Sequence, residues 1–197
     1  MKRLLLFLLL FAVAQSAFGQ EKTLLRGKID HGGFGGPVVK FTQIDDQFGV
    51  LVGGRAGWII DHSIVLGFGG YGLSNEVKGE NTFAGFDQNL NFGYGGFEME
   101  YIVKSDDLVH LTFYTLIGAG AVNYRLDAEV TDINWDPEAD PFFALEPAVN
   151  FEINLTTFFR LNIGAGYRYI SGVNDYGLTD SDLSGLSGNL TFKFGSF

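Results

Sequence analysis

The sequence contains no cysteine, and this absence removes several kinds of chemistry at once. None of the 197 residues is Cys, so the chain has no disulfide framework and no thiolate that could act as a nucleophile or a metal ligand. The stability of the fold must therefore come from strand pairing and from the burial of side chains in lipid or in a core.

Positive charge is also scarce. The chain has 13 Lys and Arg against 23 Asp and Glu, which gives a formal net charge of −10. Proteins that hold nucleic acid present basic surfaces to its phosphates. This acidic chain is a poor candidate for that role, and we expect no nucleic-acid partner.

Beyond its first residues, the sequence lacks an apolar run long enough to cross a bilayer as a helix. The start of the chain has the three parts of an export signal: Lys2 and Arg3, an apolar run over 4–13, and small residues that end at Gly19. The apolar run is about ten residues against the ~20 that a spanning helix needs, which argues against an uncleaved anchor. We expect residues 1–19 to be a cleaved signal peptide.

The last third of the chain alternates with a period of two residues. From Phe159 to Tyr169 every second residue is apolar, and the residues between them are polar or lack a side chain. Successive side chains of a β-strand point to opposite faces of the sheet. The pattern predicts a strand with one apolar and one polar face. After an export signal, such strands indicate a membrane-spanning β-barrel.

Eight segments of the chain read as strands. Each is near or above the ~9–11 residues that a tilted strand needs to cross a bilayer. We therefore expect residues 20–197 to form one all-β domain, an eight-stranded antiparallel up-and-down transmembrane β-barrel. The expected strands cover 33–43, 47–60, 63–73, 88–103, 108–124, 142–154, 157–170 and 185–197.

The connections between these segments alternate in length. Short turns alternate with long loops, except that the first of the loops, 43–46, is also short. In outer-membrane barrels the short turns face the periplasm and the long loops face outside, and we expect the same orientation here. The short turns are expected at 61–62, 104–107 and 154–156, and the long loops at 74–87, 125–141 and 171–184.

With this alternation and loop asymmetry, nearly all of the mature chain resembles the small eight-stranded outer-membrane barrels of Gram-negative bacteria, of the OmpA transmembrane-domain or OmpX type. The last strand adds to the resemblance, because Leu190, Phe192 and Phe194 look like the aromatic-ended signal that the barrel assembly machinery reads. Phe197, which we include in this assembly signal, is out of phase with them. Either Phe194 ends the signal and three residues extend it, or Gly195 permits a bulge.

Two details of the expected strands need a local explanation. In the fourth strand the apolar residues change parity between Tyr94 and Phe97, and a β-bulge at Gly95-Gly96 would keep both sets facing lipid. In the sixth strand, Pro147 cannot donate a hydrogen bond to a neighbouring strand. It argues mildly against that strand.

If the apolar parity faces lipid, the opposite parity carries charge into the lumen. Five positive and four negative side chains lie on it, so their charges nearly cancel. An eight-stranded interior is only wide enough to be filled by side chains, and buried charges are tolerated when they are paired. Two interpretations stay open, a salt-bridged plug that holds the barrel rigid and a narrow or gated polar path. The lumen charge network consists of Lys40, Arg55, Glu98, Glu100, Glu146, Glu152, Arg160, Arg168 and Lys193.

The expected loop 125–141 concentrates acidic residues. Within it, Asp132, Asn134 and Asp136 have the alternate spacing of a calcium-binding loop, but the glycine and the final bidentate acid of that motif are missing. These three residues are weak metal candidates, and a simple solvated loop is the plainer interpretation. Trp135 lies among them with no strand parity to explain it, so we regard it as the best candidate for contact with a partner.

The three histidines are scattered. His31 precedes the first expected strand, His62 lies in a turn, and His110 lies near the turn side of the fifth strand. Catalysis needs a nucleophile, a base and an orienting group close together, and the sequence shows no such set. We expect no enzymatic activity and no cofactor.

The residues and the resemblance together imply a non-enzymatic protein of the outer membrane. We expect a rigid scaffold that is inserted by the barrel assembly machinery, lies among outer-membrane lipids and presents acidic loops for structural or adhesive roles. An extracellular partner would bind through those loops. The first alternative is a narrow channel or conduit for small solutes. The second is a soluble periplasmic ligand-binding barrel, in which the apolar parity would face a central cavity.

Overall fold

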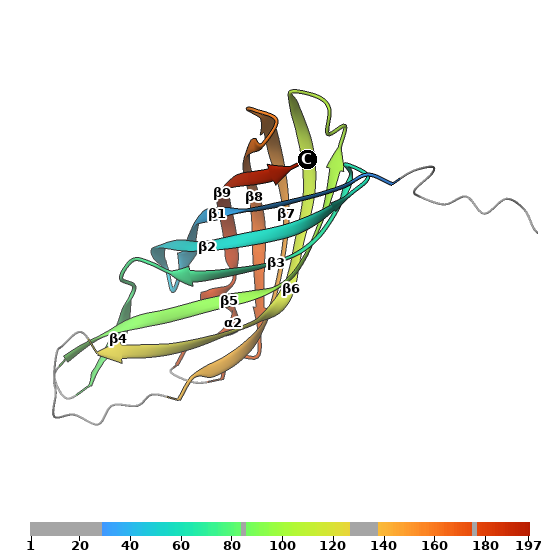
Figure 1. The fold of residues 1–197 in the computed structure, drawn as a ribbon. Helices are drawn as coiled ribbons and strands as arrows, with labels where there is room; N and C mark the ends of the chain where they lie inside the picture. The colour runs from blue at the N-terminus through green and yellow to red at the C-terminus, as the bar shows by residue number, and fades with distance from the viewer. Residues whose placement is uncertain (1–28, 84–85, 127–137, 175–176) are drawn as a thin grey trace, which may run out of the picture.

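The computed structural model describes residues 29–83, 86–126, 138–174 and 177–197. Over these residues the chain forms nine strands and one helical turn (Figure 1). The elements are β1 (His31–Ile44), β2 (Gln47–Ile60), β3 (Ile64–Leu73), β4 (Lys78–Phe83), β5 (Phe86–Val103), β6 (Val109–Leu126), β7 (Asp140–Asn154), β8 (Phe159–Ser171), α2 (Asp180–Leu183) and β9 (Gly185–Ser196).

Eight of these strands close into one antiparallel barrel. Hydrogen-bonded neighbours follow the order β3-β2-β1-β9-β8-β7-β6-β5, and a further pairing between β3 and β5 closes the ring. The eight-stranded antiparallel up-and-down barrel expected from the sequence is therefore confirmed. Two elements were not expected: β4, which extends from the loop-side part of β5 as a hairpin, and α2, which lies in the connection from β8 to β9.

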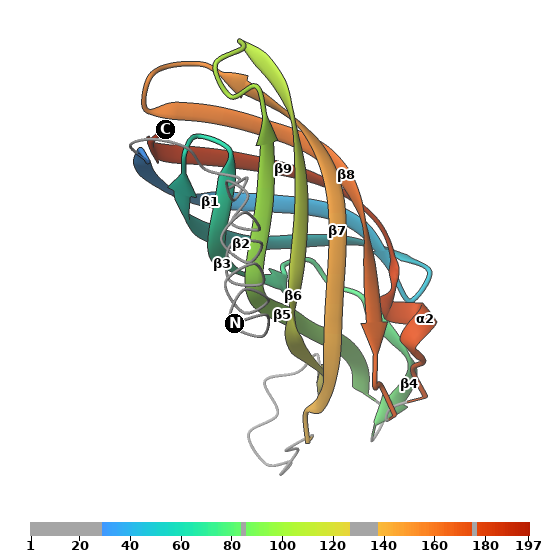
Figure 2. The ribbon, with the colours of Figure 1, turned by 90° about the vertical axis from the view of Figure 1, so that its right-hand side faces the viewer.

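The two ends of the barrel differ, as the connection lengths predicted. We call the end with the turns at 61–63, 104–108 and 155–158 the turn end, and the end with the 45–46 turn, β4 and α2 the loop end. Figure 2 shows α2 and β4 together at one end and the carboxy terminus at the other. The 45–46 turn is tight because Asp45 and Asp46 adopt φ values of 49° and 56°, which is the backbone of a two-residue hairpin loop.

The apolar parity of the strands faces outward. Large hydrophobic side chains are exposed on all eight barrel strands, for example Phe68 on β3, which is 69 % exposed, and Phe151 on β7, which is 59 % exposed. The residues between them are buried in the lumen. The alternative of a barrel whose alternating apolar side chains line a central cavity is wrong, because these side chains form the outer surface.

No bulge occurs at Gly95-Gly96, so that expectation was wrong. β5 pairs with β3 and with β6 in unbroken register through both glycines. As a result, Leu90, Phe92 and Tyr94 point into the lumen, whereas Phe97 points outward. The change of parity reflects a change in the interior, which is apolar toward the loop end.

Pro147 lies inside β7 despite the argument against it. Its side chain faces outward, and the β7–β8 ladder is interrupted there: residues are paired up to Leu145 and again from Ala148. On the other side, Pro147 keeps its place opposite Thr115 of β6. A missing N–H therefore costs one local gap in the ladder and does not end the strand.

Candidate functional site

All nine charged side chains of the expected lumen network lie inside the barrel. Each residue is at most 8 % exposed. They come from six strands, β1, β2, β5, β7, β8 and β9, and each occupies an inward position in the alternation of its strand. Water cannot solvate charges in such a place, so each charge needs a partner within the protein.

Five of these residues form a continuous chain of ion pairs across the lumen. Arg55 Nε lies 2.7 Å from Glu98 Oε2, and Arg55 Nη2 lies 2.9 Å from Glu100 Oε2. Lys193 Nζ lies 2.8 Å from Glu100 Oε1 and also pairs with Glu152. The signs of the charges alternate along this chain. It connects β2, β5, β9 and β7, no two of which are neighbours in the ring, so the pairs tie separate walls together.

Glu152 collects further donors toward the turn end. Arg160 Nη1 lies 3.1 Å from its Oε1 atom, and His110 Nε2 lies 3.2 Å from the same oxygen. Asn162 donates to the other carboxylate oxygen at 3.3 Å. His110 was not expected in this group from the sequence. His110 and Thr112 lie on the same face of β6, and this shared parity could have identified His110 as inward-facing.

A second cluster surrounds Glu146 nearer the loop end. Lys40 Nζ lies 2.6 Å from Glu146 Oε2, and the Tyr94 hydroxyl donates to the same oxygen at 2.7 Å. The Ser187 hydroxyl donates to Oε1 at 2.8 Å. Lys40 Nζ also lies 3.5 Å from the centre of the Tyr71 ring, a position in which the ring face attracts the ammonium group.

Tyrosine hydroxyls complete the network, and the sequence analysis did not identify them. Tyr71 and Tyr114 both donate to Glu98 Oε1, at 2.6 and 2.8 Å. Space for this carboxylate depends on Gly69, because a Cβ atom there would contact the Glu98 oxygen. Counting Arg55, this buried carboxylate accepts three hydrogen bonds, so both of its oxygens have partners.

Arg168 is the exception among the five cations. Its Nε donates to the Leu183 carbonyl oxygen at 2.7 Å, and its Nη2 donates to the Gln43 carbonyl oxygen at 3.3 Å. Its Nη1 has no hydrogen-bond partner, and it forms no ion pair with a described carboxylate. The structure thus brings together eight of the nine expected residues, and Arg168 lies apart at the loop end.

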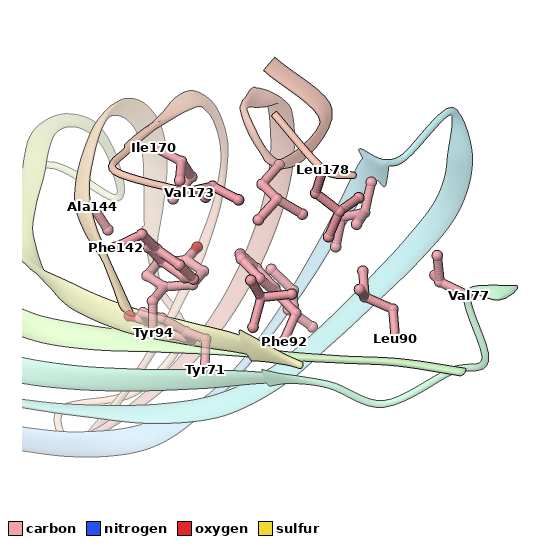
Figure 3. Packing of buried hydrophobic residues seen from close by; sticks show 14 of the residues in the cluster. Tyr71, Val77, Leu90, Phe92, Tyr94, Phe142, Ala144, Ile170, Val173 and Leu178 are labelled. Carbon is pink, nitrogen blue, oxygen red and sulfur yellow. The ribbon is translucent and has the colours of Figure 1, made fainter. Parts of the chain in front are cut away.

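Apolar clusters cover the charges on both sides. At the turn end, Phe34, Ile59, Val65 and Ile102 pack together, and Phe197 packs against them. At the loop end a larger cluster includes residues of β5, β7, β8 and the segment that carries α2, as Figure 3 shows. Both mouths of the lumen are therefore filled with hydrophobic side chains.

Phe197 lies inside the barrel and not in the outer aromatic row. Its ring lies 6.4 Å from that of Phe34, and the Arg160 guanidinium carbon lies 4.1 Å from its centre. β9 stays in register with β1 through Gly195 and Ser196, so no bulge brings Phe197 outward. Phe194 therefore ends the outward row, and three residues extend beyond it.

A small cavity lies in the middle of the lumen, among the described residues. It is lined by Lys40, Arg55, Tyr71 and Tyr114 and has a volume of about 10 Å³, which is about the minimum that accommodates one water molecule. Every charged side chain around it is already paired. The charged side chains around this cavity are buried and packed together.

Other sequence candidates fall outside what the structure describes. Trp135 and the weak metal candidates Asp132, Asn134 and Asp136 lie in 127–137, which is not described. Among the described residues, no group of three or more His, Asp or Glu is placed to hold a metal ion. In the same part of the chain, no helix has the length and apolar character needed to cross a membrane.

No protein-family model matches the sequence, and no curated protein matches it either. Solved structures do share its fold. Neisserial surface protein A, NspA, superposes with a TM-score of 0.54 at 12 % identity, over 86 % of this chain and 99 % of NspA. The N-terminal β-barrel domain of Pseudomonas aeruginosa OprF gives 0.51 at 12 % identity, over 84 % of this chain and 96 % of that domain.

A third solved structure is Ail, the attachment invasion locus protein of Yersinia pestis, in complex with the heparin analogue sucrose octasulfate. It gives a TM-score of 0.52 at 11 % identity, over 86 % of this chain and 99 % of Ail. At such identities the likeness shows the fold alone. The chain has the fold of the small eight-stranded outer-membrane barrels, as the sequence resemblance implied.

Proposed function

We propose that this chain is an outer-membrane protein whose eight strands cross the bilayer, with the turn end in the periplasm and the loop end outside. The outward apolar surface supports this proposal, because exposed hydrophobic side chains on every barrel strand suit lipid and not water. The fold shared with NspA, OprF and Ail also supports it.

The proposal includes export and assembly. Residues 1–19 would be removed as a signal peptide, and the barrel assembly machinery would insert the mature chain. Leu190, Phe192 and Phe194 occupy the outward parity of β9, so they offer a lipid-facing row for that recognition. Phe197 would not take part, because its ring lies in the lumen.

We propose a non-enzymatic role, in which the barrel is a closed and rigid scaffold for its outer loops. The observation that carries this proposal is the filled lumen: eight paired charges form its middle, and apolar clusters cover them at both ends. The alternative of a narrow channel receives no support from such an interior, because ions would have to displace the paired charges. Exposed loops on a rigid barrel are well suited to structural or adhesive contacts.

The charge of the chain restricts the partner. Ail was solved with a sulfated sugar analogue, which is a polyanion. The present chain is acidic overall, with a net charge of −10, and its loop 125–141 concentrates acidic residues. We therefore propose an extracellular partner with a basic or neutral surface, contacted through that loop and Trp135.

Fractionation of expressing cells tests the proposal. We expect the protein in the outer-membrane fraction, without its first 19 residues, and as a compact band in unboiled gels that shifts on boiling. Recovery from the soluble periplasm would contradict it. For the partner, Trp135→Ala should reduce attachment of expressing cells to a surface coated with basic protein, whereas Trp58→Ala, on the outward face of β2, should not.

A further inference from the structure

A positive charge is buried at the loop end of the lumen, and no carboxylate in the described part of the chain forms an ion pair with it. Arg168 is fully buried, two of its nitrogens donate to backbone carbonyl oxygens, and Nη1 has no partner among the described residues. Carbonyl oxygens accept hydrogen bonds but do not neutralise the guanidinium charge. A carboxylate can pair with two guanidinium nitrogens at once and neutralise the charge. The arrangement therefore favours an anion over the oxygens that now contact Arg168.

The walls around this charge are apolar. The Phe92 ring centre lies 5.2 Å from Arg168 Cζ, and Phe92 stacks on Phe142 with 5.3 Å between the ring centres. Leu90 and Ile170 belong to the same buried cluster (Figure 3). We call the group formed by Leu90, Phe92, Phe142 and Ile170 the apolar cup. An apolar cup with one cation beside it matches a ligand that has an alkyl chain and one anionic head group.

A segment of the chain itself occupies the cup. Leu183, the last residue of α2, accepts the hydrogen bond from Arg168 through its carbonyl oxygen, and its side chain is fully buried in the cluster. Leu178 adds a second buried alkyl side chain just before α2. Leu183 thus supplies both an oxygen for the guanidinium group and an alkyl group for the cup. Segment 177–184 thus fills the positions that the polar head and the alkyl chain of an amphiphile would occupy.

We propose that the loop end is a binding site for a medium-chain fatty acid. Its carboxylate pairs with Arg168, and its alkyl chain replaces Leu183 in the apolar cup when segment 177–184 moves outward. A single carboxylate matches the guanidinium charge of Arg168, whereas a phosphate monoester carries more charge than one arginine neutralises. The polar network lies beneath the cup, so the site is a blind cup and not a conduit.

The contacts of segment 177–184 allow such an exchange. Side-chain and backbone hydrogen bonds hold it to the rim, including Ile170 N to Ser184 Oγ at 2.9 Å and Asp45 N to Asp182 O at 2.8 Å. No strand pairing of the ring involves it. Its acidic residues, Asp180 and Asp182, leave with it and do not oppose an entering carboxylate.

Equilibrium dialysis of the full mature barrel, held in amphipol, tests the proposal with decanoate as the probe and decanol as its uncharged counterpart. We expect saturable binding of one decanoate per barrel and about tenfold weaker binding of decanol. Arg168→Met should remove that tenfold preference and leave decanol binding unchanged. Leu183→Ala should tighten decanoate binding, because segment 177–184, which competes with decanoate for the apolar cup, is then held less tightly. Leu186→Ala is the matched control, since Leu186 is 75 % exposed on the outer face.

Each variant must first keep the compact unboiled band, so that loss of binding is not confused with loss of folding. If Arg168→Met does not fold, Arg168→Lys replaces it; this variant keeps the charge, loses the two-nitrogen fork, and should bind decanoate more weakly. The proposal is overturned if neither the wild type nor Leu183→Ala binds decanoate saturably. It is equally overturned if the folded Arg168 variant keeps its preference for decanoate. The same holds if the variant loses as much affinity for decanol as for decanoate.

Discussion

Arg55 Nε lies 2.7 Å from Glu98 Oε2, with both side chains buried in the middle of the lumen. The same guanidinium group reaches Glu100, two residues further along β5. The two carboxylates face Arg55 together because alternate residues of a strand share a face. Arg55 therefore neutralises part of two buried charges at once, as Lys193 does for Glu100 and Glu152.

Removal of this cation should destabilise the barrel strongly. We expect Arg55→Met to lower the free energy of unfolding by about 3–5 kcal/mol, because Glu98 and Glu100 lose a shared partner inside the protein. Urea unfolding in lipid vesicles, followed by the gel shift, measures the change. Arg125→Met, at an exposed position of β6, is the control and should stay within about 0.5 kcal/mol of the wild type. A loss below about 1 kcal/mol for Arg55→Met would contradict the paired interior.

The pair of Lys40 and Glu146 allows a test of coupling. Lys40→Met and Glu146→Leu each leave one buried charge without its main partner, so each alone should be costly. The double variant replaces the pair with apolar side chains. Its loss of unfolding free energy should be smaller than the sum of the two single losses by at least about 1 kcal/mol. Additive losses would show that the two groups do not stabilise each other.

Two adjacent glycines on β3 provide a matched comparison. A Cβ atom at Gly69 would lie 2.7 Å from the Tyr71 hydroxyl and 2.8 Å from Glu98 Cδ, whereas one at Gly70 would meet no atom within 4 Å. We expect Gly69→Ala to cost about 1–3 kcal/mol through overpacking of the lumen. Gly70→Ala should be nearly neutral. The temperature at which the unboiled band is lost compares them, and equal behaviour would argue against a packed interior at Glu98.

Two variants at the end of the chain should affect assembly and stability separately. Phe194 is exposed on the outward face of β9, and Phe197 packs inside against Phe34 and Arg160. We expect Phe194→Ala to lower the amount of assembled barrel in the outer membrane. Phe197→Ala should assemble normally but lose about 1–3 kcal/mol of stability. If Phe197→Ala impaired assembly as much as Phe194→Ala, the assembly signal would extend to the last residue.

The period of two residues explains how much of the fold could be predicted. Around Phe159 to Tyr169 the alternation is unbroken, and the charged residues between apolar ones, such as Arg160, could be assigned to the lumen from sequence alone. Strand parity does not say whether an inward position is polar or apolar. For this reason the sequence predicts a lipid-facing position for Phe92, which faces an apolar part of the lumen, and for Tyr94, whose hydroxyl reaches Glu146 there.

The remaining parts of the site depend on partners that are distant in sequence. Tyr71 and Tyr114 are 43 residues apart, and only closure of the ring brings their hydroxyls to Glu98. Arg168 shares its parity with paired cations, and its lack of a carboxylate follows from its position next to Leu183. Neither relationship leaves a local pattern in the sequence.

A closed lumen carries no ion current, so conductance across a planar bilayer shows whether the lumen of this barrel is closed. For the purified mature barrel we predict no discrete current steps above the bilayer baseline, because paired charges and apolar clusters fill the interior. Reproducible current steps would show that the lumen is open, above all if their ion selectivity changed in Arg160→Met or Glu146→Gln, since the path would then pass these residues.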